Sequence, residues 1–146
     1  MKSLKLFGLV ASMLLFLNVQ AQEVTDYDLQ NFARAYRETV QLNLKAQNEM
    51  AGEIQKAGLD LDTYHAIHES KQPGAEYEPE LPDSDFDKYE KVQPKIVKIQ
   101  SQLEADVLAT YKKHDLTKKK YAAISERVKQ DYILQAKLEK ILAAMR

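Results

Sequence analysis

The chain has 146 residues, with 21 basic and 22 acidic side chains, three histidines and no cysteine. This length suits one domain with a real core, and the near balance of charges argues against nucleic-acid binding through a basic surface. The lack of cysteine excludes disulfides, thiolate nucleophiles and cysteine-based metal sites.

Residues 1–21 are typical of a secretory signal peptide. Lys2 and Lys5 form a short basic start, and the apolar run that follows is too short to span a membrane. The run ends in a small-residue pattern that predicts cleavage after Ala21. No cysteine follows it, so a lipoprotein anchor is excluded. We therefore expect the mature chain, residues 22–146, to be periplasmic or secreted and to have no transmembrane segment.

The mature chain has a helix-forming composition. It is rich in Ala, Leu, Lys, Gln and Glu and contains three of the four glycines. Its net charge is −3, because the predicted signal peptide contains two basic residues and no acidic one. Apolar side chains recur at spacings of three and four between residues 29 and 57, which predicts one face of a long helix. The predicted class is all-α.

The chain aligns with itself at an offset of 57 residues, which indicates an internal duplication. The half-repeats cover about 25–71 and 84–130, each with a long helix followed by a short one. A polar, proline-containing linker spans 72–83, and a terminal helix covers about 131–143. The sequence thus predicts one domain at 22–146, a bundle of two pseudo-repeated long-helix/short-helix hairpins plus a C-terminal helix. The matched residues are Asp28/Asp85, Phe32/Tyr89, Val40/Val97, Leu59/Leu116, Tyr64/Tyr121, Ile67/Ile124 and Glu69/Glu126.

Two positions depart from this regular pattern. Pro94 falls inside the second long helix, so we expect a kink or a break between Glu90 and Pro94. Asp115 replaces Gly58 at the end of the second long helix, where we expect the same left-handed backbone, because Asp enters this region more readily than most residues.

Together these residues resemble a family of small exported bacterial helical proteins known as domain of unknown function 4168. The resemblance covers about residues 25–142. It implies an exported helical protein and no particular activity or cofactor. The matching positions are Leu29, Phe32, Ala33, Ala35, Tyr36, Gly58, Leu59, Tyr64, Ile67, Leu116, Thr117, Tyr121, Ile124, Asp131 and Leu134.

Four polar residues interrupt the apolar stripes at mid-length of the two long helices: Asn43, Gln47, Gln100 and Glu104. If the helices pack side by side, they form a polar layer. Three interpretations remain open: a buried layer that fixes register, an exposed groove, and a ligand-binding or acid–base site.

Five lysines crowd the turn of the second half and form a candidate interaction patch: Lys112, Lys113, Lys118, Lys119 and Lys120. Such a patch could dock onto anionic lipid headgroups or an acidic partner. The alternatives are an ordinary solvated turn and a turn screened by the acidic linker.

His65 and His68 are three residues apart on the first short helix, with Glu69 beside them. This spacing allows a shared divalent metal ion, although zinc sites need three or four ligands. The competing interpretation is a packed histidine at the edge of the core. Accordingly we assign no metal site.

The sequence contains no nucleophile–base arrangement, no phosphate-binding loop and no strand framework for one, so we expect no enzyme activity and no cofactor. The most favoured function is an envelope-associated binding or interaction module. The alternative is a small-ligand or metal carrier that uses the His65/His68 turn or the polar layer. The partner would be an unknown protein or envelope component, no nucleic acid is expected, and a homo-oligomer is possible.

Overall fold

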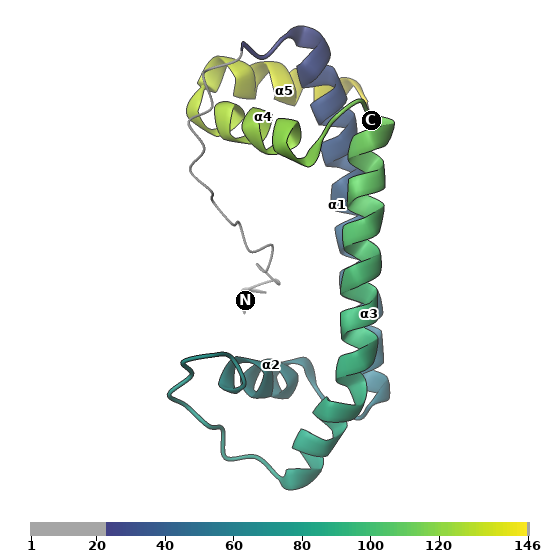
Figure 1. Cartoon of the computed structure of the whole chain (residues 1–146), viewed down its shortest axis with the longest axis vertical. Coiled ribbons are helices and arrows are strands. Elements are labelled where there is room, and N and C mark those ends of the chain that lie inside the picture. The colour runs from purple at the N-terminus through teal and green to yellow at the C-terminus, as the bar shows by residue number, and fades with distance from the viewer. Residues whose placement is uncertain (1–22, 146) are drawn as a thin grey trace. The chain divides into compact units, whose positions relative to one another are not determined.

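The computed structural model describes residues 23–145, so the predicted signal peptide at 1–21 lies outside the described residues. The described part is helical and contains no strand, which confirms the all-α class. Figure 1 shows its five helices, which are α1 (Asp26–Lys56), α2 (Leu61–Ser70), α3 (Asp83–Lys113), α4 (Lys118–Gln130) and α5 (Tyr132–Ala144).

The helix boundaries follow the predicted duplication. α1 and α3 are both 31 residues long, and their first residues are 57 positions apart. The first residues of α2 and α4, Leu61 and Lys118, are also 57 positions apart. The helices therefore confirm a bundle of two pseudo-repeated long-helix/short-helix hairpins followed by a C-terminal helix.

Equivalent turns end the two long helices. Gly58 and Asp115 both have a left-handed backbone, with φ of 80° and 55°. In each turn this residue donates its N–H to a carbonyl three positions back, and the next leucine donates to one five positions back. This Schellman pattern satisfies the last carbonyls of the helix and explains why both helices stop there. Asp60 and Thr117 then cap α2 and α4, as each side chain accepts a backbone N–H.

Pro94 does not break α3, which runs unbroken from Asp83 to Lys113. Figure 1 shows the helix bending in its first half, the region that contains Pro94. Proline removes one intrahelical hydrogen bond, so a bend without a break is the physical consequence here. Buried neighbours on the same helix, Val92 and Ile96, hold the two sides of the bend against the core.

The contacts divide the described chain into two compact units. Unit 1 comprises the described residues up to Arg37 and those from Tyr111 onward, and unit 2 comprises Glu38–Thr110. α1 and α3 contribute residues to both units. Each unit is described by its own contacts below.

The cores of the two units are built from corresponding positions of the repeat. In unit 1 the start of α1 packs with the turn before α4 and with α4 itself, whereas in unit 2 the start of α3 packs with the turn before α2 and with α2. Phe32 contacts Tyr121 with ring centroids 4.7 Å apart, and their repeat mates Tyr89 and Tyr64 are 5.2 Å apart. The unit 1 core contains Leu29, Phe32, Ala35, Leu116 and Ile124, and the unit 2 core contains Met50, Ile54, Leu59, Tyr64, Ile67, Tyr89, Val92 and Ile96.

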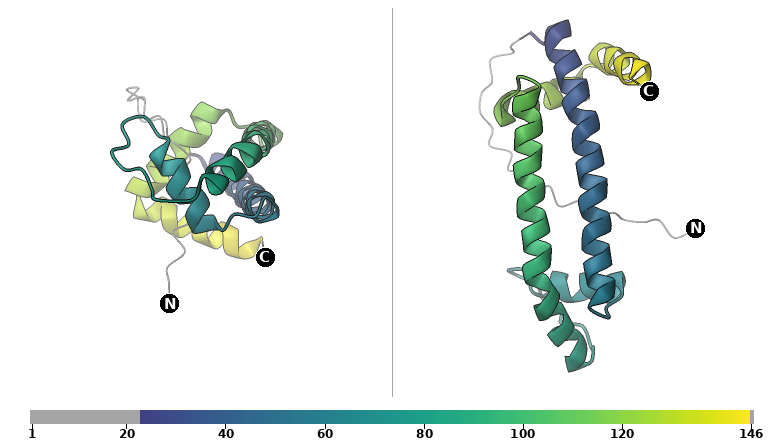
Figure 2. Two further views of the ribbon diagram at one scale, coloured as in Figure 1. Left: turned by 90° about the horizontal axis from the view of Figure 1, so that it is seen from below. Right: turned by 90° about the vertical axis from the view of Figure 1, so that its right-hand side faces the viewer.

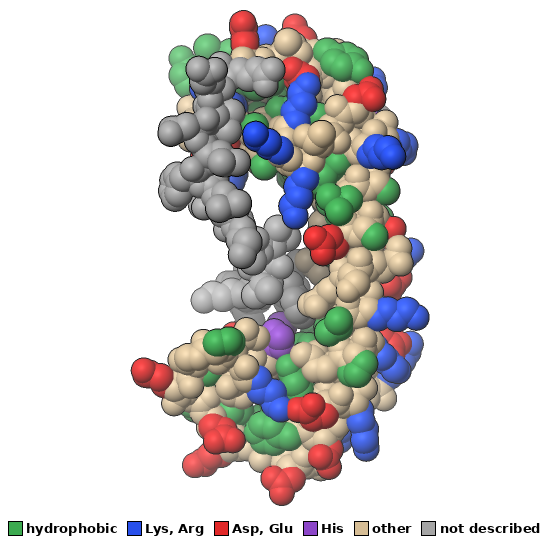
Figure 3. All heavy atoms as spheres, in the orientation of Figure 1, with side chains coloured by type: hydrophobic (Ala, Val, Ile, Leu, Met, Phe, Trp, Pro, Cys, Tyr) green, Lys and Arg blue, Asp and Glu red, His purple; other side chains and the backbone are tan. Residues whose placement is uncertain are grey.

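Within unit 2, α1 and α3 run antiparallel and side by side, as Figure 2 shows, and α2 crosses one end of this pair. The linker returns from α2 to α3, with Pro79 buried and Leu81 packed against the core. Figure 3 shows acidic side chains gathered at the lower end of the view, over the linker and the first turns of α3. Because α2 has only ten residues, about 15 Å of helix, it cannot cover the whole α1/α3 pair.

Candidate functional site

One face of the α1/α3 pair in unit 2 is covered by α2 at one end and open beyond it. On α1 this face carries a stripe of side chains. The stripe runs from Ile54, which is fully buried, through Gln47, which is half-buried, to Leu44 and Val40. The steps of three and four residues keep all these positions on one side of the helix. Leu44 is 50% and Val40 is 39% exposed, so the same side of α1 loses its cover with distance from α2.

The matching stripe on α3 begins at Gln93, whose side chain accepts a hydrogen bond from Tyr64 of α2 at 2.9 Å. It continues at steps of four and three through Val97, Gln100, Glu104 and Leu108. Val97 is 54% and Leu108 is 41% exposed. This surface is called the open face below, and it consists of Val40, Leu44, Gln47, Val97, Gln100, Glu104 and Leu108.

The four predicted polar residues lie at or beside this open face. Gln100 and Glu104 are exposed, and Gln47 and Asn43 are half-buried. Asn43 donates its side-chain amide to the carbonyl of Thr39, one turn earlier in its own helix, at 2.8 Å. The four residues therefore lie on the two antiparallel helices of unit 2, two of them half-buried and two exposed. Their role as a binding site stays a prediction.

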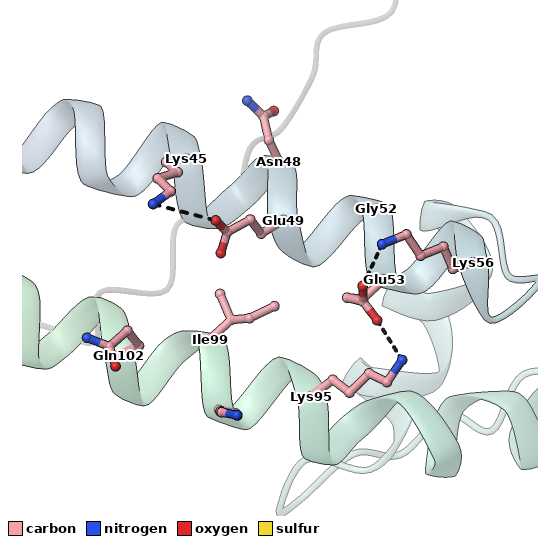
Figure 4. A pocket seen from close by; sticks show the side chains of 10 residues that line it. Lys45, Asn48, Glu49, Gly52, Glu53, Lys56, Lys95, Ile99 and Gln102 are labelled. Atoms are coloured by element: carbon pink, nitrogen blue, oxygen red, sulfur yellow. Dashed lines mark hydrogen bonds and ion pairs between the residues drawn. The ribbon is translucent and has the colours of Figure 1, made fainter.

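Unit 2 also has a charged groove between α1 and α3. Figure 4 shows Glu53 of α1 reaching both Lys56 on its own helix and Lys95 on α3. The N–O distances are 2.8 Å and 2.7 Å. These two hydrogen bonds lower the pKa of Glu53 from 4.5 to about 2. The groove is lined by Lys45, Asn48, Glu49, Gly52, Glu53, Lys56, Lys95, Lys98, Ile99 and Gln102.

Because the pKa of Glu53 is lower in the folded chain than its ordinary value of 4.5, its ion pairs stabilise the fold fully above that value. We expect this contribution to fade as the pH falls from about 4.5 to about 2. Glu53→Gln should therefore be less stable than the unchanged chain at pH 7 and equally stable near pH 2, as measured by urea unfolding. Glu49→Gln is the control, because it removes only an exposed pair with Lys45 at 3.8 Å. A difference that does not shrink at low pH would contradict this role.

A chain of hydrogen bonds joins α2 to α3 at the edge of the unit 2 core. Tyr64 donates to the side-chain oxygen of Gln93, and Gln93 donates its amide to the hydroxyl of Tyr89 at 2.6 Å. The Tyr89 hydroxyl lies 2.9 Å from Nδ1 of His68. Which of these two groups donates depends on the tautomer of His68. Burial raises the pKa of Tyr64 to about 12, so this hydroxyl keeps its proton.

The amide nitrogen of Gln72 lies 3.1 Å from Nε2 of His68 and also donates to the backbone carbonyl of His68 at 3.3 Å. An amide nitrogen only donates, so Nε2 accepts, and the ring proton of His68 lies on Nδ1, facing the Tyr89 hydroxyl. We expect long-range ¹H–¹⁵N correlation spectra to show the Nδ1–H tautomer. Tyr89→Phe should shift His68 toward Nε2–H and leave the signals of His114 unchanged. An Nε2–H tautomer in the unchanged chain would contradict this assignment.

The structure gives His65 and His68 no metal-binding arrangement. Both ring nitrogens of His68 face hydrogen-bond partners, and the ring of His65 packs edge-on against Tyr64. Among residues 23–145, no group of three or more His, Asp and Glu side chains is placed to hold a metal ion. His68 thus lies at the edge of the core, where it packs on Tyr64.

The five predicted patch lysines all belong to unit 1, and all are exposed. Lys120 forms an ion pair with Asp28 of α1 at 2.5 Å, and this contact lowers the pKa of Asp28. Beside them, Tyr27 donates its hydroxyl to Asp115 at 2.9 Å. Lys120 therefore links α4 to α1. A binding role for the patch stays a prediction.

The family model described as a domain of unknown function, DUF4168, matches residues 25–138. The chain belongs to this family. The DUF4168 match spans α1 to α4 and the first half of α5, and it agrees with the resemblance seen in the sequence. No curated protein and no solved structure matches the chain. None of the helices within 23–145 is long and apolar enough to cross a lipid bilayer.

Proposed function

We propose that this DUF4168 protein is a non-catalytic binding module that acts outside the cytoplasm, at the cell envelope, and that the open face is its contact surface. The observation that supports this function is a set of four large apolar side chains, 39% to 54% exposed, on one side of a two-helix pair: Val40, Leu44, Val97 and Leu108. Exposed apolar patches of this kind mark interaction surfaces more often than isolated exposed residues do.

The charge distribution favours the open face over the groove as the contact surface. The open face carries one charged residue, Glu104, whereas six of the ten residues that line the groove are charged. Depletion of charge is typical of the centre of protein interfaces. The alternative function, a small-ligand or metal carrier, has less support, because the groove is crossed by ion pairs and His68 is engaged by Tyr89.

Native mass spectrometry of the chain purified from its own host tests both parts of this proposal. Export predicts that residues 1–21 are missing from the measured mass and that the protein lies in the envelope or medium. Binding through the open face predicts a complex that Leu44→Glu removes and Lys98→Glu, a charge change on the groove side, retains. An uncleaved cytoplasmic chain would contradict export. Complexes that respond equally to both substitutions would contradict the assigned surface.

A further inference from the structure

Gly52 lies inside α1, where neither the backbone nor a close neighbour requires a glycine. Unlike Gly58 and Gly74, it has no left-handed backbone. Apart from the backbone of its own helix, no described atom lies within 4 Å of the place that a Cβ at Gly52 would occupy. Glycine is less favourable than alanine in a helix interior, and the equivalent position of the second repeat is Ala109. Nothing in the described part of the fold therefore accounts for this glycine.

The missing side chain of Gly52 leaves room in the charged groove between α1 and α3. The groove offers about 940 Å³, within the range of about 300–1,000 Å³ that is usual for small-molecule sites. Figure 4 shows the ion pairs of Glu53 at one end of the groove and the pair of Lys45 with Glu49 at the other, with Ile99 between them. The ion pairs of Glu53 thus occupy one end of the groove only.

The groove gathers the basic residues of an acidic unit. Unit 2 contains fifteen acidic and seven basic residues, yet four of the basic and only two of the acidic residues line the groove. Glu53 engages two of the four lysines, and Glu49 pairs with Lys45 at 3.8 Å. The fourth, Lys98, has no hydrogen bond or ion pair with another residue of 23–145. Its ammonium group is therefore free to bind an anion from outside.

We propose that this groove binds a small organic anion, a carboxylate attached to an apolar chain. The carboxylate accepts a hydrogen bond from Lys98, and such a charge-assisted bond is stronger than one between neutral groups. The apolar chain lies across Gly52 and Ile99, where it is removed from water. This site goes beyond the proposed function, because it consists of other residues than the open face and takes a different kind of ligand.

The lining of the groove favours an organic anion over an inorganic one. The groove is lined from the interiors of two helices, whose backbone N–H groups are already bonded, so it offers no helix N-terminus to an ion such as phosphate. Exposed lysines alone hold a solvated ion weakly. The side chain of Ile99 and the aliphatic stems of the lysines provide apolar surface, which only a ligand with an apolar part can use.

Titration of the isotope-labelled chain with octanoate, followed by ¹H–¹⁵N correlation spectra, tests this site. We expect the amide signals of Gly52 and Ile99 to shift with a dissociation constant below about 1 mM. 1-Octanol has the same apolar chain without the charge and should bind at least about tenfold more weakly. Inorganic phosphate should not shift Gly52. Octanoate that leaves Gly52 unshifted, or binds no better than either of the other two probes, would overturn the site.

The role of Lys98 is tested by removing its charge. Lys98→Gln should raise the dissociation constant of octanoate at least about fivefold, because the carboxylate loses its ammonium partner. Lys91→Gln is the matched control, since Lys91 is an exposed lysine of the same helix that does not line the groove. It should leave the constant within about twofold. Equal effects of the two substitutions would mean general attraction by positive charge and no specific site.

The role of Gly52 is tested by filling the space that it leaves. Gly52→Leu should abolish octanoate binding. The same substitution should raise the urea midpoint of unfolding, because leucine is a better helix former and its side chain starts in open space. A loss of binding in a more stable chain cannot come from unfolding. A Gly52→Leu chain that binds octanoate like the unchanged chain would contradict the groove as the site.

The open face serves as the final control, because an apolar chain could also bind there. Leu44→Glu should leave octanoate binding within about twofold. Octanoate binding that Leu44→Glu removes and Gly52→Leu retains would place the ligand on the open face and overturn the groove site. The protein complex of the proposed function has the opposite dependence, since Leu44→Glu should remove it and Gly52→Leu should retain it. Failure of either one is therefore visible without the other.

Discussion

Replacing Phe32 with alanine should lower the free energy of unfolding by about 3–5 kcal/mol. Phe32 is 3% exposed in the core of unit 1, where its ring packs against Tyr121 at 4.7 Å and Tyr36 at 6.2 Å. The substitution removes the whole ring and leaves a cavity between α1 and α4. Urea unfolding followed by far-ultraviolet circular dichroism measures the loss.

The control for Phe32 is Tyr132→Ala, which also removes an aromatic ring from unit 1. Tyr132 is 80% exposed, so its removal should change stability by no more than about 0.5 kcal/mol. A Phe32→Ala loss below about 1 kcal/mol would show that the unit 1 core is not packed as described.

Ile67→Ala should lower the free energy of unfolding by about 2–5 kcal/mol. Ile67 is fully buried in the core of unit 2, where α2 packs under α1 and α3. The loss combines the lost burial of the side chain with the cavity left behind. Ile133→Ala is a control of identical chemistry, because Ile133 is 55% exposed and should cost little. Equal losses for the two isoleucines would contradict the placement of α2.

The helix ends are predictable from the sequence because local chemistry determines them. Gly58 supplies the left-handed residue that ends α1, and Asp60 supplies the cap that starts α2. Because the chain is duplicated, the same prediction applies to Asp115 and Thr117, although aspartate adopts a left-handed backbone less readily than glycine does. Each of these features depends on residues within one or two turns.

The open face could not be predicted in the same way. The spacing of Val40 and Leu44 shows that they share a side of one helix, but spacing does not reveal what covers that side. The cover depends on α2, which reaches only Ile54 and its surroundings and leaves the next two turns exposed. The hydrogen-bond chain to His68 could not be predicted from the sequence either, because Tyr89 and Gln93 lie more than twenty residues away from His68 along the chain.

Pro94 shows how tertiary contacts change a local expectation. Proline disrupts an isolated helix by about 3 kcal/mol, which makes a break plausible from sequence alone. In unit 2 the flanking residues Val92 and Ile96 are both 2% exposed. Their burial offsets the lost hydrogen bond, and the helix bends instead of ending.

Each of the two cores combines residues from both repeats. Unit 1 joins the start of the first repeat to the turn and short helix of the second, and unit 2 joins the start of the second to the turn and short helix of the first. A single repeat therefore has both halves of a core but cannot fold one half onto the other. Each core is therefore complete only when two repeats are present, and because both repeats belong to one chain, the two cores can differ in sequence and size.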